Sequence, residues 1–179
     1  MTMAHPAQIK IPATYMRGGT SKGVFFRLQD LPAACQQPGN ARDKLFLRVI
    51  GSPDPYAAHI DGMGGATSST SKCVILSKSS VPDHDVDYLY GQVSIDKAFV
   101  DWSGNCGNLS TAAGAFAIHA GLVDPARHQV TGSRELVLQQ DPAPGIKTKG
   151  ARVVGVDQEV TLAVGQIQLK FSGQISRQP

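Results

Sequence analysis

The strongest constraint on the fold is an apolar segment built from small residues. The stretch LSTAAGAFAIHAGLV (109–123) predicts a helix over about 108–120, closed by Gly121 with Pro125 just beyond it. A helix on a protein surface normally carries a polar face, and this one has almost none. We therefore expect the rest of the chain to wrap around it.

The remaining sequence predicts mostly short strands. Among its 179 residues are 19 Gly and 11 Pro, which favour turns over long helices. Alternating or β-branched runs predict strands at 8–16, 24–28, 73–77, 85–95 and 98–102, and several more after Pro125. A Gly-rich turn over 16–23 would join the first two as a hairpin, and Asn40 would cap a short helix over 40–50. Together these elements predict an α+β fold.

A cysteine stands where the apolar helix begins. Cys106 lies in the frame GNCGN, and Gly and Asn both suit a tight turn. Unpaired N–H groups at a helix N-terminus favour a thiolate and can also bind a carboxylate. The alternative is a small buried apolar residue in a turn, which would not need Gly and Asn on both sides.

Two further segments carry polar groups suited to binding anions. In GGATSSTSK (64–72), hydroxyls precede Lys72, which would supply positive charge or act as a base. A phosphate-binding loop is excluded, because Lys72 follows Ser71 and opens a strand instead of a helix. In MRGGTSKG (16–23), Arg17 would clamp a carboxylate with help from hydroxyls. A solvated loop and an ordinary hairpin turn remain the alternatives for these two segments.

Composition excludes several other classes of function. The net charge is only +3, and no Lys/Arg cluster alternates with aromatic residues, so we expect no nucleic-acid binding. No run approaches the ~20 apolar residues of a membrane span. The three cysteines and five histidines lack metal-ligand spacing. Unpaired cysteines and the absence of a secretory signal pattern predict a cytoplasmic protein.

Three long segments together resemble one known family. They are TYMRGGTSKGVFF, IGSPDPYAAHIDGMGGATSSTSK and DVDYLYGQVSIDKAFVDWSGNCGNLSTAAGAFAIHAGLV. They resemble the 2-methylaconitate cis–trans isomerase family of the PrpF type, which has the diaminopimelate epimerase-like fold. The resemblance runs from about residue 8 to about 127. It implies two similar halves, each a curled sheet around a central helix, with the site between them. The helix at 108–120 would be the central helix of the first half.

The resemblance also implies an activity and a set of site residues. The expected reaction converts trans-2-methylaconitate to its cis isomer in the methylcitrate route of propionate catabolism, without a metal or an organic cofactor. Lys72 would be the base and Cys106 a proton donor or positioning group, and which of the two transfers the proton stays open. The residues expected to bind the tricarboxylate are Arg17, Thr20, Ser21, Ser68, Ser69, Ser71, Asn105, Gly107 and Asn108. An iron–sulfur methylcitrate dehydratase, which makes the trans isomer, is the expected functional partner.

The resemblance suggests a boundary within the chain. We expect an epimerase-like domain over 1–127 and a β-rich tail over 128–179 that departs from the family, with the second family domain absent. A homodimer would be another way to supply the missing wall of the site.

Three alternative functions remain open. The first is a non-catalytic module that binds a tricarboxylate or docks on the dehydratase. The second is an allylic isomerase that acts on another unsaturated di- or tricarboxylate. The third is a cofactor-free racemase or epimerase. Such enzymes pair two cysteines across a cleft, whereas Cys73 would point to the side opposite Lys72 if 73–77 is a strand.

Overall fold

The protein is described from a computed structural model that covers residues 8–82, 84–124, 137–140, 158–163 and 166–171. The strands are β1 (Thr14–Gly18), β2 (Ser21–Arg27), β3 (Lys72–Lys78), β4 (Val86–Val93), β5 (Val100–Asp101), β6 (Val137–Gln140), β7 (Gln158–Ala163) and β8 (Gln166–Phe171). The helices are α1 (Ala33–Gln36), α2 (Asn40–Ile50) and α3 (Gly107–His119), with a short 3₁₀ helix at Leu28–Asp30.

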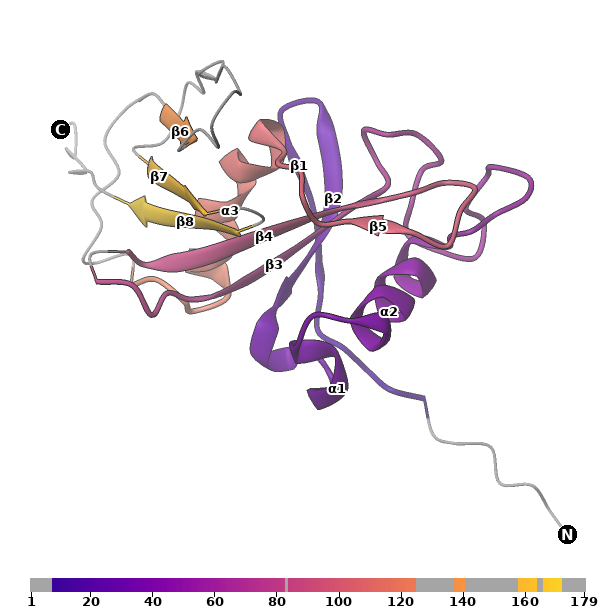
Figure 1. The fold of residues 1–179 in the computed structure, drawn as a ribbon, viewed down its shortest axis with the longest axis horizontal. Coiled ribbons are helices and arrows are strands. Elements are labelled where there is room, and N and C mark those ends of the chain that lie inside the picture. Colours follow the sequence, from indigo (N-terminus) through magenta and orange to yellow (C-terminus); the bar gives the residue numbers. More distant parts are fainter. Residues whose placement is uncertain (1–7, 83, 125–136, 141–157, 164–165, 172–179) are drawn as a thin grey trace, which may run out of the picture.

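The strands form one curled, open sheet in the order β1-β2-β3-β4-β8-β7-β6, with β5 beside β4 (Figure 1). Strands β2 and β3 run parallel, and β3 and β4 run antiparallel. The long connection between β2 and β3 contains α1 and α2, as a parallel crossover requires.

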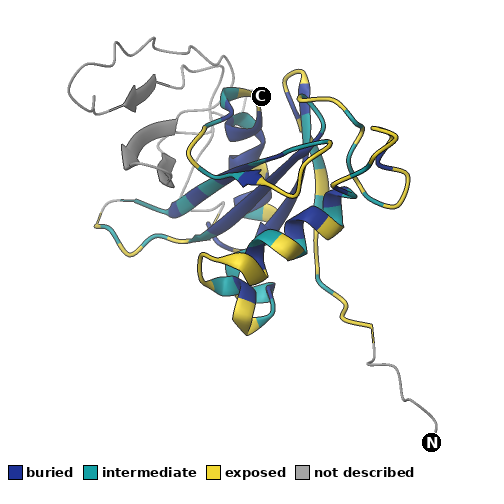
Figure 2. Cartoon of the chain, turned by 45° about the vertical axis from the view of Figure 1, so that its right-hand side comes forward, coloured by how far each residue is buried: buried dark blue, intermediate teal, exposed yellow. Residues whose placement is uncertain are grey.

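Each face of the sheet carries its own hydrophobic core. On one face, α3 packs against side chains such as Val74 and Leu76 of β3. On the other face, α1 and α2 pack against Cys73 and Ile75 of the same strand. This alternation follows from the period of two in a strand, and it buries β3 on both sides (Figure 2).

Helix α3 confirms the prediction that an apolar helix is enclosed by strands. Its bounds agree with the predicted 108–120 to within one residue, and it contacts β1, β2, β3 and β4. The helix ends in a Schellman motif: Leu122 N–H donates to the Ala117 carbonyl at 2.8 Å, and Gly121 N–H donates to the Ile118 carbonyl at 3.0 Å. Gly121 has φ +68°, a left-handed conformation that glycine adopts without strain. The expected α+β fold, a curled sheet against a central apolar helix, is therefore confirmed.

The hairpin of β1 and β2 is tighter than predicted. Most of 16–23 is paired strand, with Gly18 opposite Ser21, so the turn contains only Gly19 and Thr20. The prediction of a strand over 8–16 is wrong for residues 8–13. Pairing starts at Thr14, just after Pro12, which has no N–H to donate to a sheet.

Glycine at position 18 allows the hairpin to approach α3 closely. A Cβ there would overlap the backbone carbonyl of Asn108. The hairpin and the start of α3 are therefore in direct backbone contact.

Helix α2 has the predicted bounds but not the predicted cap. Asn40 is the first helical residue, and Gly39 occupies the cap position without any side-chain hydrogen bond. The Gly39 carbonyl instead accepts the first backbone bond, from Asp43 N–H at 3.1 Å.

No helix within the described part of the chain is both long and apolar enough to cross a membrane.

Candidate functional site

Cys106 lies immediately before α3, in the position that the sequence predicted. It is the N-cap residue, with extended backbone (φ −127°, ψ 98°), and its side chain is buried. Its Sγ lies 3.7 Å from the Ser21 hydroxyl oxygen. The first backbone N–H groups of a helix have no partner within it, so the thiol sits at the positive end of the helix dipole.

The hairpin turn and the start of α3 share hydrogen bonds. The Asn108 amide donates to the Thr20 hydroxyl at 3.0 Å and to the Ser21 hydroxyl at 3.5 Å. Arg17, which is exposed, donates to the Thr20 carbonyl at 3.4 Å. Hydroxyl, amide and guanidinium groups thus gather beside the helix N-terminus, a combination suited to binding carboxylates.

The Ser/Thr loop before β3 is held against the hairpin and against a buried histidine. Lys22 N–H donates to the Ser69 carbonyl at 2.9 Å. Ser71 is fully buried, and its hydroxyl lies 3.5 Å from Nδ1 of His59, which is also buried. Ser68, in contrast, is exposed. The two ends of the loop therefore differ in exposure, and only the Ser71 end is enclosed.

Lys72 takes part in a closed set of hydrogen bonds with two residues of β4. Its buried amine donates to the Tyr90 hydroxyl at 2.7 Å and to Gln92 Oε1 at 2.8 Å. The Tyr90 hydroxyl in turn donates to Gln92 Oε1 at 2.6 Å. Gln92 Nε2 donates to the Ser71 carbonyl at 2.9 Å, which fixes the orientation of the amide. We call Lys72, Tyr90 and Gln92 the lysine triangle.

Tyr90 is the member of the lysine triangle that packs in the same buried cluster as Cys106. Burial raises the pKa of the Tyr90 phenol well above its usual range, and the nearby Cys106, Cys73 and Asp101 raise it further. The phenol therefore stays protonated near neutral pH, which the bond that it donates to Gln92 requires.

Comparison with known proteins identifies the family. A family model described as "PrpF protein" matches residues 8–153. The chain belongs to the PrpF family. This match extends past residue 127, where the sequence resemblance was expected to end. Residues 125–136 and 141–157 lie outside the described part of the chain, and the proposed domain boundary at 127 stays a prediction.

Two PrpF-type relatives are highly similar over about two thirds of the chain. The 2-methyl-aconitate isomerase of Cupriavidus necator is 78% identical over 125 residues, which are 70% of this chain and 32% of the relative. The 2-methyl-aconitate isomerase of Shewanella oneidensis is 80% identical over 122 residues, 68% of this chain and 31% of the relative. The match thus spans about a third of the length of either relative.

A solved structure agrees with the fold. The crystal structure of methylitaconate-delta-isomerase superposes with a TM-score of 0.59 at 38% identity, covering 79% of this chain and 40% of that chain. Relatives of this chain with known structure therefore include an enzyme named as a delta-isomerase.

The structure brings most of the predicted PrpF site residues to one region. Arg17, Thr20, Ser21, Cys106 and Asn108 form one hydrogen-bonded group at the start of α3. Gly107 is the first residue of that helix, and Asn105, just before it, has a buried Oδ1 with no partner among the described residues. Ser69 and Ser71 lie in the loop leading to Lys72, whereas Ser68 faces solvent. The roles assigned to these residues stay predictions.

Sequence reasoning missed Tyr90 and Gln92. The alternation over 85–95 predicts a strand and puts these two residues on one face, but it does not indicate what they contact. The signal that was lacking is the register: Gln92 lies directly opposite Lys72 in the β3–β4 pair, and Tyr90 is two residues away.

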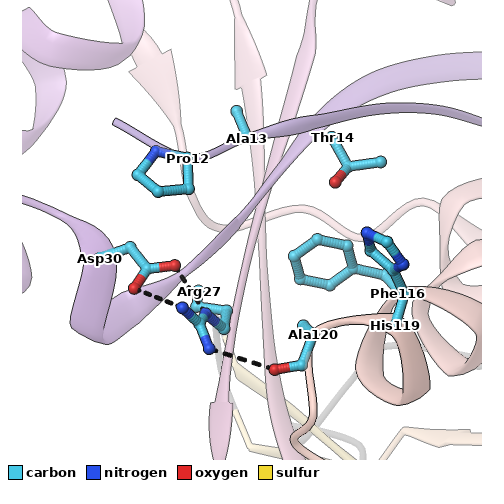
Figure 3. Close-up of a pocket in the computed structure, with 8 residues that line it drawn as sticks. All are labelled: Pro12, Ala13, Thr14, Arg27, Asp30, Phe116, His119 and Ala120. Carbon is cyan, nitrogen blue, oxygen red and sulfur yellow. Dashed lines mark hydrogen bonds and ion pairs between the residues drawn. The ribbon is translucent and has the colours of Figure 1, made fainter. Parts of the chain in front are cut away.

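Two cavities lie apart from this region. One, of about 330 Å³, lies between the start of β1 and the end of α3, where Arg27 is paired with Asp30 and also donates to the Ala120 carbonyl (Figure 3). The other, of about 380 Å³, is lined by residues of the loop 51–61. Neither of the two is lined by Lys72 or Cys106, so the candidate site is the polar group at the start of α3 together with the lysine triangle.

Proposed function

We propose that the protein acts in the isomerisation of trans-2-methylaconitate to the cis isomer by removal and return of an allylic proton. The observation that carries the proposal is that Tyr90, which is hydrogen-bonded to Lys72, packs in the same buried cluster as Cys106. Lys72 would thereby face the carboxylate-binding start of α3. Similarity to two enzymes named 2-methyl-aconitate isomerase supports the choice of substrate.

In the proposed reaction, Lys72 Nζ takes the allylic proton. The electron pair of the broken C–H bond is delocalised over the former double bond and into a carboxylate, so negative charge builds on the carboxylate oxygens. While the charge is delocalised, the former double bond has single-bond character and can rotate. Return of a proton from Lys72, or from the Cys106 thiol, then fixes the new geometry.

The start of α3 would stabilise that charge. The Asn108 amide is already hydrogen-bonded to the hydroxyls of Thr20 and Ser21, and the backbone N–H groups there are held in place by the helix. Groups that are positioned before the reaction stabilise developing charge without reorganising. Their effect is greatest on the carbanion, whose oxygens carry more charge than those of the substrate.

The proposal also covers the partners of the protein and its compartment. The matched part of the chain corresponds to about a third of the 2-methyl-aconitate isomerases. The proposal also includes a homodimer, whose second copy would add a wall to the site, and an iron–sulfur dehydratase as supplier of the trans isomer. The three free cysteines support a reducing, cytoplasmic setting.

A proton NMR time course of trans-2-methylaconitate in heavy water, with the purified 179-residue chain, tests the proposal. We expect the cis isomer to appear while solvent deuterium enters an allylic position. Substrate binding without turnover would contradict catalysis by this chain and favour a tricarboxylate-binding module. Faster turnover of an analogue that lacks the methyl group would instead identify a different unsaturated acid as substrate.

The same assay distinguishes the roles of the two candidate catalytic groups. If Cys106 returns the proton, Cys106→Ser lowers turnover by about 100-fold. Retention of most of the turnover in this variant would assign both proton transfers to Lys72 and leave the thiol a positioning role. Cys35→Ser, a change in the core on the opposite face of the sheet, is the control for general effects of losing a buried thiol.

A further inference from the structure

The lysine triangle fixes more than the position of the Lys72 amine. A lysine nitrogen has three substituent directions besides its bond to Cε. Two of them are taken by the bonds to Tyr90 and Gln92, whether the amine is neutral or protonated. The third direction is left to carry the lone pair of the neutral amine or the third N–H of the ammonium.

The acceptors in the triangle cannot exchange roles. Gln92 Oε1 accepts from both Lys72 and Tyr90, which occupies both of its lone pairs. The amide cannot flip without losing its bond to the Ser71 carbonyl. The Tyr90 phenol can accept from Lys72 only while its own proton points to Gln92. While Lys72 is protonated, every donor and acceptor in the cycle thus has a single assignment, and only the third N–H can be lost without breaking a bond of the triangle.

We propose that Tyr90 and Gln92 are positioning residues that aim the reactive lone pair of Lys72 at the substrate. This inference rests on the proposed function for its consequence in catalysis. A neutral amine donates its two N–H groups to β4, and its lone pair points away from that strand. The amine therefore does not need to rotate before it takes a proton, and a freely rotating lysine would lose this advantage.

The side chains that contact the Lys72 amine are uncharged, so a charge introduced there would affect its protonation. On β4 the polar groups that contact Nζ are Tyr90 and Gln92, both uncharged. The ionisable groups acting on Tyr90 from the other elements are Cys106 at the start of α3, Cys73 on β3 and Asp101 on β5. A carboxylate in place of the Gln92 amide would be in contact with the amine and would stabilise its protonated form.

Two variants test the proposal. Tyr90→Phe removes the hydroxyl and keeps the ring, and we expect kcat to fall by about 10- to 100-fold while KM changes by less than about threefold. Gln92→Glu keeps the shape and adds charge, and we expect the pH of half-maximal rate to rise by about one unit or more. The controls are Tyr15→Phe and Gln29→Glu, which make the same chemical changes at exposed positions.

A second measurement does not depend on turnover. In protein labelled with 13C and 15N in its lysine side chains, the Lys72 signal is identified by its loss in Lys72→Arg. We expect Gln92→Glu to move the pH midpoint of this signal upward, and Tyr90→Phe to change its chemical shift, with the controls unchanged. If the signal responds but the unmodified chain shows no turnover, the proposed function fails and the positioning of Lys72 stands. If both variants leave the signal and the kinetics unchanged in a folded protein, the positioning proposal is wrong.

Discussion

The amine of Lys72 donates a 2.7 Å hydrogen bond to the hydroxyl of Tyr90, across the β3–β4 pair. The contact joins a residue at the first position of β3 to a phenol buried beneath α3. It places a basic group at the edge of a hydrophobic core without leaving that group unpaired, since an unpaired buried amine would destabilise the fold.

Replacement of Lys72 by methionine should remove the base while keeping much of the side chain's volume. We expect turnover of trans-2-methylaconitate to fall by at least about 100-fold. The comparison is Lys78→Met, at the exposed end of the same strand. Turnover of the Lys72→Met protein within a few-fold of the unmodified chain would rule out Lys72 as the base.

The Cys73 thiol should be unreactive while the protein is folded. Burial raises the pKa of Cys73 far above the usual range of a thiol, and its side chain is fully enclosed. Since the thiolate is the nucleophile, iodoacetamide at pH 8 should leave Cys73 unmodified until urea unfolds the protein. Mass-spectrometric mapping of the labelled peptides measures this. Labelling of Cys73 in the folded state as fast as in urea would contradict the structure.

Addition of a methyl group at Gly18 should separate the hairpin from α3. A Cβ there overlaps the Asn108 carbonyl, so one of the two backbones must move. We expect Gly18→Ala to destabilise the protein by about 2 kcal/mol in urea unfolding, as overpacking does. At Gly104, an added Cβ would make only ordinary contacts with the Tyr90 ring, 3.6 Å away, so Gly104→Ala is the matched control. Equal stability of the two variants would argue against this close approach.

The loop 54–59 should make stability depend on pH below neutrality. Backbone N–H groups of Tyr56, Ala58 and His59 lower the pKa of Asp54 below its ordinary value of 3.8. The carboxylate therefore contributes stability above pH 3.8, and this contribution is lost as pH falls through the lower folded value.

Replacement of Asp54 by asparagine tests this contribution. Asp54→Asn should lower the urea midpoint at pH 6 and flatten its decline as the pH falls below about 4. Asp61→Asn, an exposed carboxylate in the same connection, should leave that decline as it is in the unmodified chain. A decline equally steep in the Asp54→Asn protein would show that another group is responsible.

The sequence was sufficient to predict features that depend on local pattern. The apolar run after Cys106 predicted α3 and the thiol at its start, because few other positions suit a helix without a polar face. The β-branched run after Lys72 predicted β3. Pro12 carries a local signal as well, because a residue without an N–H cannot donate to a sheet and the first strand begins after it.

Features that depend on strand pairing were not predictable in the same way. Tyr90 and Gln92 reach Lys72 only because β3 and β4 pair in one particular register, and a shift by one residue would turn both side chains to the other face. Likewise, the two-residue turn at Gly19 and Thr20 follows from the pairing of Gly18 with Ser21. Nothing within 16–23 distinguishes a tight turn from a longer one.

Four strands that contact α3, β1 to β4, precede it in the chain, since β4 ends at Val93 and the helix starts at Gly107. A ribosome synthesises a chain from its N-terminus, and folding can begin on the part already made. The strands that enclose the helix are thus available before the helix emerges. A segment this apolar would attract chaperones or aggregate if it had to wait for its surroundings. The order of elements allows it to be covered as soon as it is made.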